Sequence, residues 1–308
     1  MKRTILAPGH ELLSYRIHEV TPYINWIYFF HAWGFQPRFA AIANIHGCDS
    51  CRALWLTTFP EEERSKASEA MQLFKEANRM LDQLDETISI RCIFRLCRAN
   101  ADGDNLLIEG RTFPLLRQQA PQPDGSPFLC LSDFVRPLSL GTPDIVGLFA
   151  STISEEAEET YKSDPYKHLL VQTLNDRLAE AATEKMHEYV RKEAWGYAPD
   201  ESLSIPDLLV EKYQGIRPAV GYPSLPDQSV NFLLDDLLDM GQTGITLTEN
   251  GAMHPHSSVC GMMLAHPASR YFAVGKIGED QLDDYARRRG MPIENMRKFL
   301  AGNIESAS

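Results

Sequence analysis

A segment rich in glycine and proline, from Gly215 to Pro223, constrains this chain more than any other part of its sequence. Pro218 and Pro223 each lack a backbone donor and fix φ, while Gly215 and Gly221 can adopt φ values that are closed to other residues. Neither a regular helix nor a sheet strand accommodates this pattern. The sequence therefore predicts an irregular loop with free backbone groups, and Arg217 lies inside it.

The side chains of this loop suit a small ligand that carries both signs of charge. The guanidinium group of Arg217 can hold a carboxylate through two parallel hydrogen bonds. The ring of Tyr222 offers a face that attracts cations. Taken alone, the loop fits a rigid surface turn, in which Arg217 forms an ordinary ion pair, better than it fits a ligand site.

The hydrophobic pattern elsewhere predicts helices mixed with hairpins and separated strands. Apolar residues alternate with arginines along 90–96, and a turn at 100–104 leads back into 105–109, which indicates a hairpin. Further strands are predicted over 144–152, 257–265 and 271–277, and helices over 22–33, from Pro60 onward, over 166–193 and, as two short helices, after Gly278. Regular strand–helix–strand alternation and a Gly-x-Gly-x-x-Gly motif after a strand are both absent. The sequence predicts an α+β fold with an antiparallel sheet, not a Rossmann-type fold.

Composition narrows the classes of partner. The formal net charge of −12 argues against nucleic acid and against an anionic membrane surface, since both attract cationic proteins. The longest apolar stretch, residues 24–33, is too short to span a bilayer. No apolar run follows the basic start of the chain, so no signal peptide is predicted. Six cysteines are ordinary for a cytoplasmic protein with reduced thiols.

Two short motifs contain residue types that can bind metals, but neither predicts a metal site. Cys48 and Cys51 form a Cys-x-x-Cys pair preceded by His46, and no second cysteine pair of this kind follows. His254 and His256 are two residues apart and lack an obvious third ligand. We therefore expect no structural metal ion.

Motifs spread along most of the chain resemble the activation domain of cobalamin-dependent methionine synthase. The central motif is Arg-x-x-x-Gly-Tyr-Pro, from Arg217 to Pro223. The others occur in family order: Thr21-Pro22-Tyr23-Ile24-Asn25-Trp26, Asp176-Arg177-Leu178-Ala179-Glu180-Ala181, Trp195-Gly196-Tyr197-Ala198, Glu211-Lys212-Tyr213-Gln214-Gly215, Leu247-Thr248-Glu249-Asn250, His266-Pro267, Tyr271-Phe272-Ala273-Val274 and Asp284-Tyr285-Ala286-Arg287-Arg288. The resemblance implies that family's fold, an antiparallel twisted sheet with flanking helices.

The resemblance also implies a domain plan. Residues 18–303 would form the activation domain, residues 1–17 an N-terminal extension, and residues 304–308 a tail. In the fused enzymes a cobalamin module with an Asp-x-His-x-x-Gly motif precedes this domain, and the motif does not occur in this sequence. We therefore expect either a separately encoded subunit or a truncated chain, and the start at Met1 favours the separate subunit.

The family binds S-adenosylmethionine (AdoMet), and the resemblance assigns contacts to the loop first. Arg217 would bind the AdoMet carboxylate, backbone groups of Ala219 and Gly221 would complete the pocket, and Tyr222 would present the ligand. Glu180, with Glu211, would lie near the ligand's ammonium or sulfonium group. Helical geometry alone places Glu180 on the polar side of the 166–193 helix, where it could equally be a solvated carboxylate.

Three further positions need comment. Tyr271 and Phe272 stand at the start of a predicted strand, so their side chains should point to opposite faces, and we expect one to contact the ligand. Asn25 occupies a place where the family commonly has Asp among its AdoMet contacts, so it keeps an acceptor but loses a charge. Gln228 stands where the family often has His, which puts any role for a titratable group there in doubt.

The implied function is repair of an inactivated partner. The family presents AdoMet to cobalamin while flavodoxin or another reductase supplies an electron, and methyl transfer restores methylcobalamin. For this chain the cobalamin would be held by a methionine synthase that lacks its own activation domain, and no turnover is expected without it. One alternative is an AdoMet-binding sensor or assembly partner without methyl donation. Another is an independent small-molecule methyltransferase, which we consider weaker.

Overall fold

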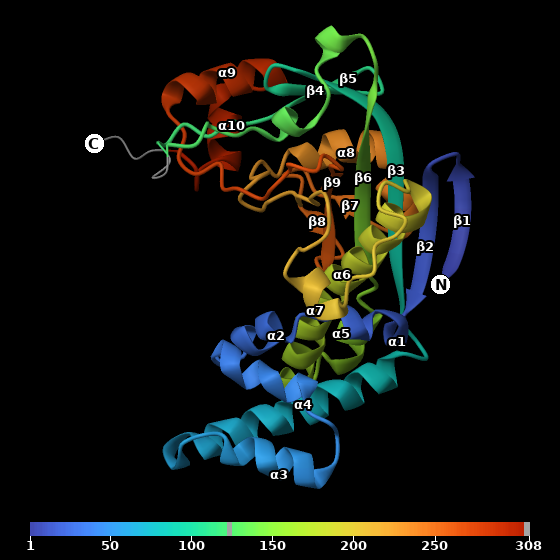
Figure 1. Cartoon of the computed structure of the whole chain (residues 1–308), viewed down its shortest axis with the longest axis vertical. Coiled ribbons are helices and arrows are strands. Elements are labelled where there is room, and N and C mark those ends of the chain that lie inside the picture. The colour runs from blue at the N-terminus through green and yellow to red at the C-terminus, as the bar shows by residue number, and fades with distance from the viewer. Residues whose placement is uncertain (122–124, 305–308) are drawn as a thin grey trace.

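A seven-stranded antiparallel sheet forms the centre of the molecule in a computed structural model that describes residues 1–121 and 125–304 (Figure 1). Its strands are β1 (Lys2–Ala7), β2 (His10–Arg16), β3 (Ser89–Asp102), β4 (Asn105–Ile108), β5 (Arg111–Pro114), β6 (Asp144–Ile153) and β9 (Ser258–Met263). The long β3 pairs with β2 and β4 along one edge and with β6 along the other. β9 pairs with the far edge of β6. A separate two-stranded sheet joins β7 (Thr246–Leu247) to β8 (Met253–His254).

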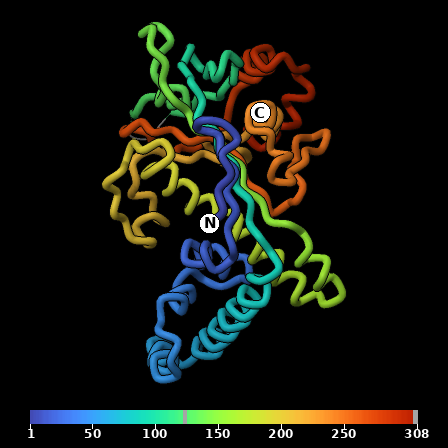
Figure 2. Tube along the Cα trace, turned by 90° about the vertical axis from the view of Figure 1, so that its right-hand side faces the viewer, coloured from blue at the N-terminus to red at the C-terminus, as the bar shows by residue number. Residues whose placement is uncertain are grey.

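Helices cover both faces of the sheet and extend beyond one end of it. The α-helices of the described ranges are α1 (Ile17–Val20), α2 (Trp26–Ala32), α3 (Asp49–Thr57), α4 (Arg64–Leu84), α5 (Glu156–Tyr161), α6 (Pro165–Tyr189), α7 (Ile205–Leu209), α8 (Val230–Leu238), α9 (Glu279–Arg289) and α10 (Ile293–Phe299). Figure 2 shows α3 and α4 projecting away from the sheet as one end of an elongated molecule. No helix in the described residues is long and apolar enough to cross a lipid bilayer.

The predicted α+β class and its antiparallel sheet are confirmed, and most predicted elements are present. The 90–96 strand and its hairpin partner are β3 and β4, and the two C-terminal helices are α9 and α10. Residues 1–17, which we expected to form an extension, supply β1 and β2. Residues 305–308, the greater part of the expected tail, lie outside the described residues. The strand predicted over 271–277 is wrong, because that segment is irregular.

The central part of β3 contributes apolar side chains to both faces of the sheet. Ile90 and Phe94 belong to a core shared with α6 and the N-terminal helices, while Ile93 and Cys97 belong to a second core shared with α8. Burying each large apolar side chain contributes about 1.5–3 kcal/mol relative to leaving it exposed. The leucine stripe of α6, including Leu174, faces the first core as its spacing predicted. α6 is thereby fixed against the sheet along most of its length.

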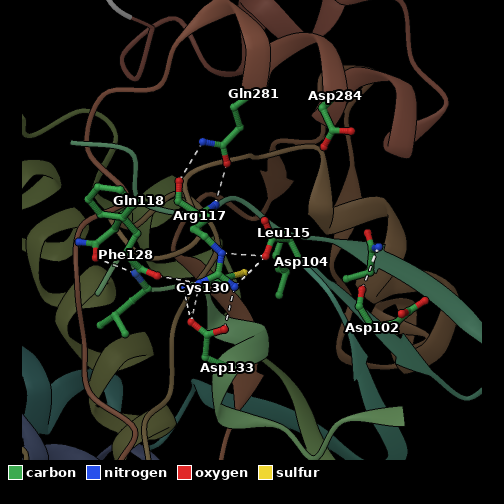
Figure 3. Close-up of polar contacts among 12 residues, drawn as sticks. Asp102, Asp104, Leu115, Arg117, Gln118, Phe128, Cys130, Asp133, Gln281 and Asp284 are labelled. Carbon is green, nitrogen blue, oxygen red and sulfur yellow. Dashed lines mark hydrogen bonds and ion pairs between the residues drawn. The ribbon is translucent and has the colours of Figure 1, made fainter. Parts of the chain in front are cut away.

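A cluster around Arg117 ties the C-terminal helices to the rest of the fold (Figure 3). The Arg117 guanidinium donates to both carboxylate oxygens of Asp133, at 2.7 and 2.8 Å, and to Asp104 at 2.8 Å. Its backbone N–H donates to Gln281 of α9 at 2.7 Å, and Gln281 donates back to the Arg117 carbonyl at 2.9 Å. This fixed cluster positions the neighbouring 271–277 segment, because Gln118 donates to the Ala273 carbonyl at 2.8 Å.

Candidate functional site

A cavity of about 720 Å³ opens where α6 and the ends of α2 and α7 meet two irregular segments of the C-terminal half. Its size is typical of a small-molecule site. Eight of the residues that the sequence singled out line it: Asn25, Glu180, Glu211, Arg217, Ala219, Tyr222, Tyr271 and Phe272. The ninth residue, Gly221, does not line the cavity. Its N–H donates to the Leu225 carbonyl at 2.9 Å in a tight turn. The fold therefore brings residues that are far apart in the sequence, and that the family resemblance pointed to, around one cavity.

Arg217 is buried in the cavity wall and already has a partner. Its Nη2 lies 2.9 Å from a carboxylate oxygen of Glu184, and the two side chains are only 11% and 8% exposed. Burial alone would lower the pKa of Arg217, but Glu184 acting together with Tyr213, Tyr271 and Glu180 outweighs it and raises that pKa. The Nε of Arg217 and the second oxygen of Glu184 have no hydrogen-bond partner among the described residues. The guanidinium group of Arg217 thus has hydrogen-bonding capacity that Glu184 does not use.

The segment that carries Arg217 is not the free loop that the sequence predicted. Ile216 and Leu264 exchange two backbone hydrogen bonds at 2.9 Å, and the Val220 N–H donates to the Cys260 carbonyl at 2.9 Å. Residues 216–220 therefore pair with the outer edge of β9 as an irregular extra strand. Gly261 permits this approach, since a Cβ atom there would lie 2.2 Å from the Pro218 carbonyl oxygen. Arg217 is held more rigidly than a loop residue would be.

Tyr271 and Phe272 line the cavity together, although we expected their side chains to point to opposite faces of a strand. The Tyr271 hydroxyl accepts a hydrogen bond from the Arg217 backbone N–H at 2.8 Å. The Phe272 N–H donates to the Ser224 hydroxyl at 3.2 Å, and that hydroxyl donates to the Phe272 carbonyl. This segment is therefore fixed by side chains rather than by a strand ladder, so successive side chains need not alternate.

Tyr222 and Glu180 form the outer part of the cavity. The Tyr222 hydroxyl donates to the Glu180 carboxylate, and burial together with that carboxylate raises the pKa of Tyr222. The tyrosine nonetheless remains 49% exposed, and Tyr28 on α2, which also lines the cavity, is 60% exposed. Two aromatic rings at the mouth of a charged cavity form a surface that a large planar partner could contact.

Asn25 and Glu211 occupy element ends at the cavity wall. The Asn25 carbonyl oxygen caps α2 by accepting a hydrogen bond from the Ile27 N–H at 3.2 Å. Glu211 follows α7 and has a φ of 60°, a left-handed conformation that non-glycine residues rarely adopt. Partial desolvation raises the pKa of Glu211, while Arg217 opposes that effect. The structure thus brings both residues to the cavity wall.

Glu184 is the residue that sequence reasoning missed. It lies four positions after Glu180 on α6, so the two carboxylates share one helix face. That spacing was visible in the sequence, but the buried pair with Arg217 depends on the tertiary fold. Three carboxylates and two arginines, Arg177 and Arg217, line the cavity, which suits a ligand that carries a carboxylate together with positive charge.

A buried network supports the pair from behind. Arg191 is fully buried and donates to Glu201 at 2.7 and 2.8 Å. Its guanidinium lies 4.1 Å from the centre of the Tyr213 ring, a cation–π contact. His187 packs edge-on against the same ring at 5.0 Å. Burial, followed by the charges of Arg191 and Arg217, holds the pKa of His187 well below its usual value, so this imidazole stays neutral.

The comparisons with known proteins agree with this architecture. Residues 16–290 match the family model of the vitamin B12-dependent methionine synthase activation domain. The structure is also similar to a crystal structure of the MetH reactivation domain bound to AdoHcy, with a TM-score of 0.84 and 37% sequence identity. That similarity covers 98% of this chain and 92% of the other. This chain belongs to the family of activation domains of vitamin B12-dependent methionine synthases.

Proposed function

We propose that this protein binds AdoMet in the cavity between α6 and the Arg217 segment, and presents its methyl group to cobalamin held by a partner protein. The observation that carries the proposal is the position of Arg217, which lines the cavity together with three carboxylates and donates to one of them, Glu184. Arg217 would bind the ligand's carboxylate, while Glu180 and Glu211 would face its ammonium and sulfonium charges. A family relative bound to AdoHcy, the demethylated product of AdoMet, supports the class of ligand.

The protein's contribution to the reaction would be orientation. The cobalamin held by the partner, after reduction by one electron from a reductase such as flavodoxin, would accept the methyl group from the sulfonium, and AdoHcy would remain in the cavity. Transfer requires the methyl carbon and the cobalt to meet in line. The exposed rings of Tyr222 and Tyr28 at the cavity mouth would meet the corrin, while Arg217 holds the other end of the ligand.

Calorimetric titration with AdoMet tests the binding step. Arg217→Ala should weaken AdoMet binding by about 1.5–3 kcal/mol, or roughly 10- to 150-fold, because a charge-assisted contact is lost. Arg111→Ala is the matched control, since Arg111 forms an ion pair with Asp236 and does not line the cavity. Because Arg217→Ala also leaves Glu184 unpaired, Glu180→Gln serves as a second variant. It should weaken AdoMet more than AdoHcy, which lacks the sulfonium charge. Unchanged affinity in both variants would refute the assignment.

A reactivation assay tests the second step. The protein is mixed with a methionine synthase fragment that carries cob(II)alamin, together with AdoMet and a reductant, and the corrin spectrum is followed. We expect the spectrum of methylcobalamin to appear with the wild type, and more slowly with Arg217→Ala at limiting AdoMet. Binding of AdoMet and of the synthase without any change in the corrin would instead favour the sensor function.

A further inference from the structure

His46, Cys48 and Cys51 form a cluster that the cavity does not use. One ring nitrogen of His46 and both sulfur atoms lie within 4.8 Å of one another. The cluster stands at the start of α3, at the projecting helical end of the molecule (Figure 1), and none of its residues lines the cavity. His46 is exposed and both cysteines are partly exposed, so an ion from solution can reach all three.

The start of α3 brings the two sulfur atoms to one side. Cys48 is the N-cap residue, and its sulfur accepts a hydrogen bond from the Cys51 N–H at 3.3 Å. Such contacts favour a thiolate, which is the form that binds metals. The turn therefore holds the two sulfur atoms close together at the start of α3.

The dimensions of the cluster fit a tetrahedral ion. With Zn–S near 2.3 Å and Zn–N near 2.0 Å, the ligand atoms of a zinc site lie roughly 3.5–3.8 Å apart. A cluster already within 4.8 Å needs only small side-chain rotations to reach that spacing. We propose that His46, Cys48 and Cys51 bind one Zn²⁺ ion, with the fourth position open to solvent.

The sequence did not predict a metal site here because it offers one Cys-x-x-Cys pair without a second pair. A lone Cys-x-x-Cys pair is weak evidence because most zinc sites need two further ligands from elsewhere in the chain. Here the third ligand comes from only two residues upstream, where the chain turns into α3. The site is peripheral, so the core does not depend on it. Loss of the ion should leave the fold and AdoMet binding intact.

Zinc titration of the full-length, reduced and metal-free protein tests the site. We expect one equivalent of Zn²⁺ to bind in competition with a chromogenic chelator. Replacing zinc with Co²⁺ should give a thiolate-to-cobalt charge-transfer band and the intense visible bands of a tetrahedral site. Cys48→Ser and Cys51→Ser should each abolish binding, and His46→Gln should weaken it at least about tenfold, since even indirect partners of metal ligands contribute 10- to 100-fold.

His31→Gln is the matched control, because His31 is an exposed histidine outside the cluster. It should bind zinc as the wild type does, and all four variants should keep the wild-type circular dichroism spectrum. Failure to bind zinc, or binding that survives all three ligand substitutions, would overturn the proposal. Rapid formation of a Cys48–Cys51 disulfide in a protein that takes up no zinc would overturn it too, and would identify the pair as a redox dithiol instead.

Discussion

The ion pair between Glu184 and Arg217 fixes the position of the arginine side chain in the unliganded cavity. Both side chains are nearly enclosed, so neither charge can be left without the other at low cost. A second guanidinium, that of Arg191, stands 4.0 Å from the other oxygen of Glu184. Glu184 therefore supplies the counter-charge that keeps the arginine buried and oriented while no ligand carboxylate is present.

Removing Glu184 should destabilise the unliganded protein strongly. We expect Glu184→Ala to lower the free energy of unfolding by about 3–5 kcal/mol, the usual cost of leaving one member of a buried pair alone. The double variant with Arg217→Ala should lose clearly less than the sum of the two single losses. Urea unfolding of the four proteins measures this coupling. Simple additivity would show that the two charges do not depend on each other.

Asn25 offers a charge change without a change of shape. Asn25→Asp should tighten AdoMet by about 0.5–1.5 kcal/mol, since it adds a carboxylate to a site for a cationic ligand. AdoHcy, which has no sulfonium, should gain less. The cap of α2 should survive, because Asp and Asn cap helices about equally well. Calorimetric titration with both ligands checks this. An unchanged ratio of the two affinities would mean that Asn25 does not face the sulfonium.

At the residue scale, the sequence predicted which residues lie at the cavity but not which residues they bond to. The motif from Arg217 to Pro223 led to the cavity, and Glu180 and Tyr271 were also placed at its wall. The hydrogen bond from the Arg217 N–H to the Tyr271 hydroxyl and the pair with Glu184 could not be predicted, because they join residues brought together only by the fold.

At the scale of elements, the docking of residues 216–220 on β9 positions the site. The segment approaches so closely that only glycine fits at position 261, where an added Cβ would also lie 2.8 Å from the Ala219 Cα. Both of these atoms, the Pro218 carbonyl oxygen and the Ala219 Cα, belong to the backbone, so no side-chain rotation can make room for the added Cβ. The register of Arg217 relative to the sheet therefore depends on Gly261.

Gly261→Ala should separate the segment from β9. We expect it to cost about 1–3 kcal/mol of stability, as overpacking does, and to weaken AdoMet binding because Arg217 moves with its backbone. Gly302→Ala is the matched control, because an added Cβ there meets nothing within 4 Å. Chemical unfolding and calorimetric titration measure the two effects. Wild-type behaviour in both would show that the close approach is not needed.

The wrong strand at 271–277 shows what periodicity cannot report. Its first residues, Tyr271 to Val274, are aromatic or apolar like those of a buried strand. In the structure their backbone groups bond to Ser224, to Gln118 and, through the Val274 N–H, to the Pro223 carbonyl at 2.9 Å. Those partners come from irregular segments, so no ladder forms. The predicted 216–220 loop failed for the opposite reason, since an edge strand was available to pair with it.

For the whole molecule, the buried His187 links global stability to pH. The folded protein holds this imidazole neutral, and the unfolded chain protonates it below its ordinary pKa of about 6.5. As pH falls below that value, the unfolded state binds the extra proton and the free energy of unfolding decreases. The slope from this one group approaches about 1.4 kcal/mol per pH unit.

His187→Gln should remove this slope. Urea unfolding at several pH values between about 7 and about 5 should show a shallower loss of stability in the variant than in the wild type. The variant's stability at neutral pH matters less than the slope, because the substitution also changes packing against Tyr213. His31→Gln should retain the wild-type slope. Parallel curves for the wild type and His187→Gln would contradict the assignment.

The sequence predicted the fold class and several of its elements, but not how those elements pack together. Motifs in family order carried the α+β fold with its antiparallel sheet, and hydrophobic spacing located α6, β3 and β6 within a few residues. Spacing in one dimension cannot tell that β3 contributes apolar side chains to both faces of the sheet or that α3 and α4 project from the sheet. Those features depend on how helices from distant parts of the chain share the two cores.

The pairing of residues 216–220 with β9 also affects the tendency of the protein to aggregate. β9 is the last strand on its side of the sheet, and this segment occupies the backbone groups that an exposed edge would offer to another chain. Any opening of the segment would uncover β9 as a template for intermolecular strand addition. A ligand that secures Arg217 would close that edge, so the contact that we propose for AdoMet binding would also protect the protein from aggregation.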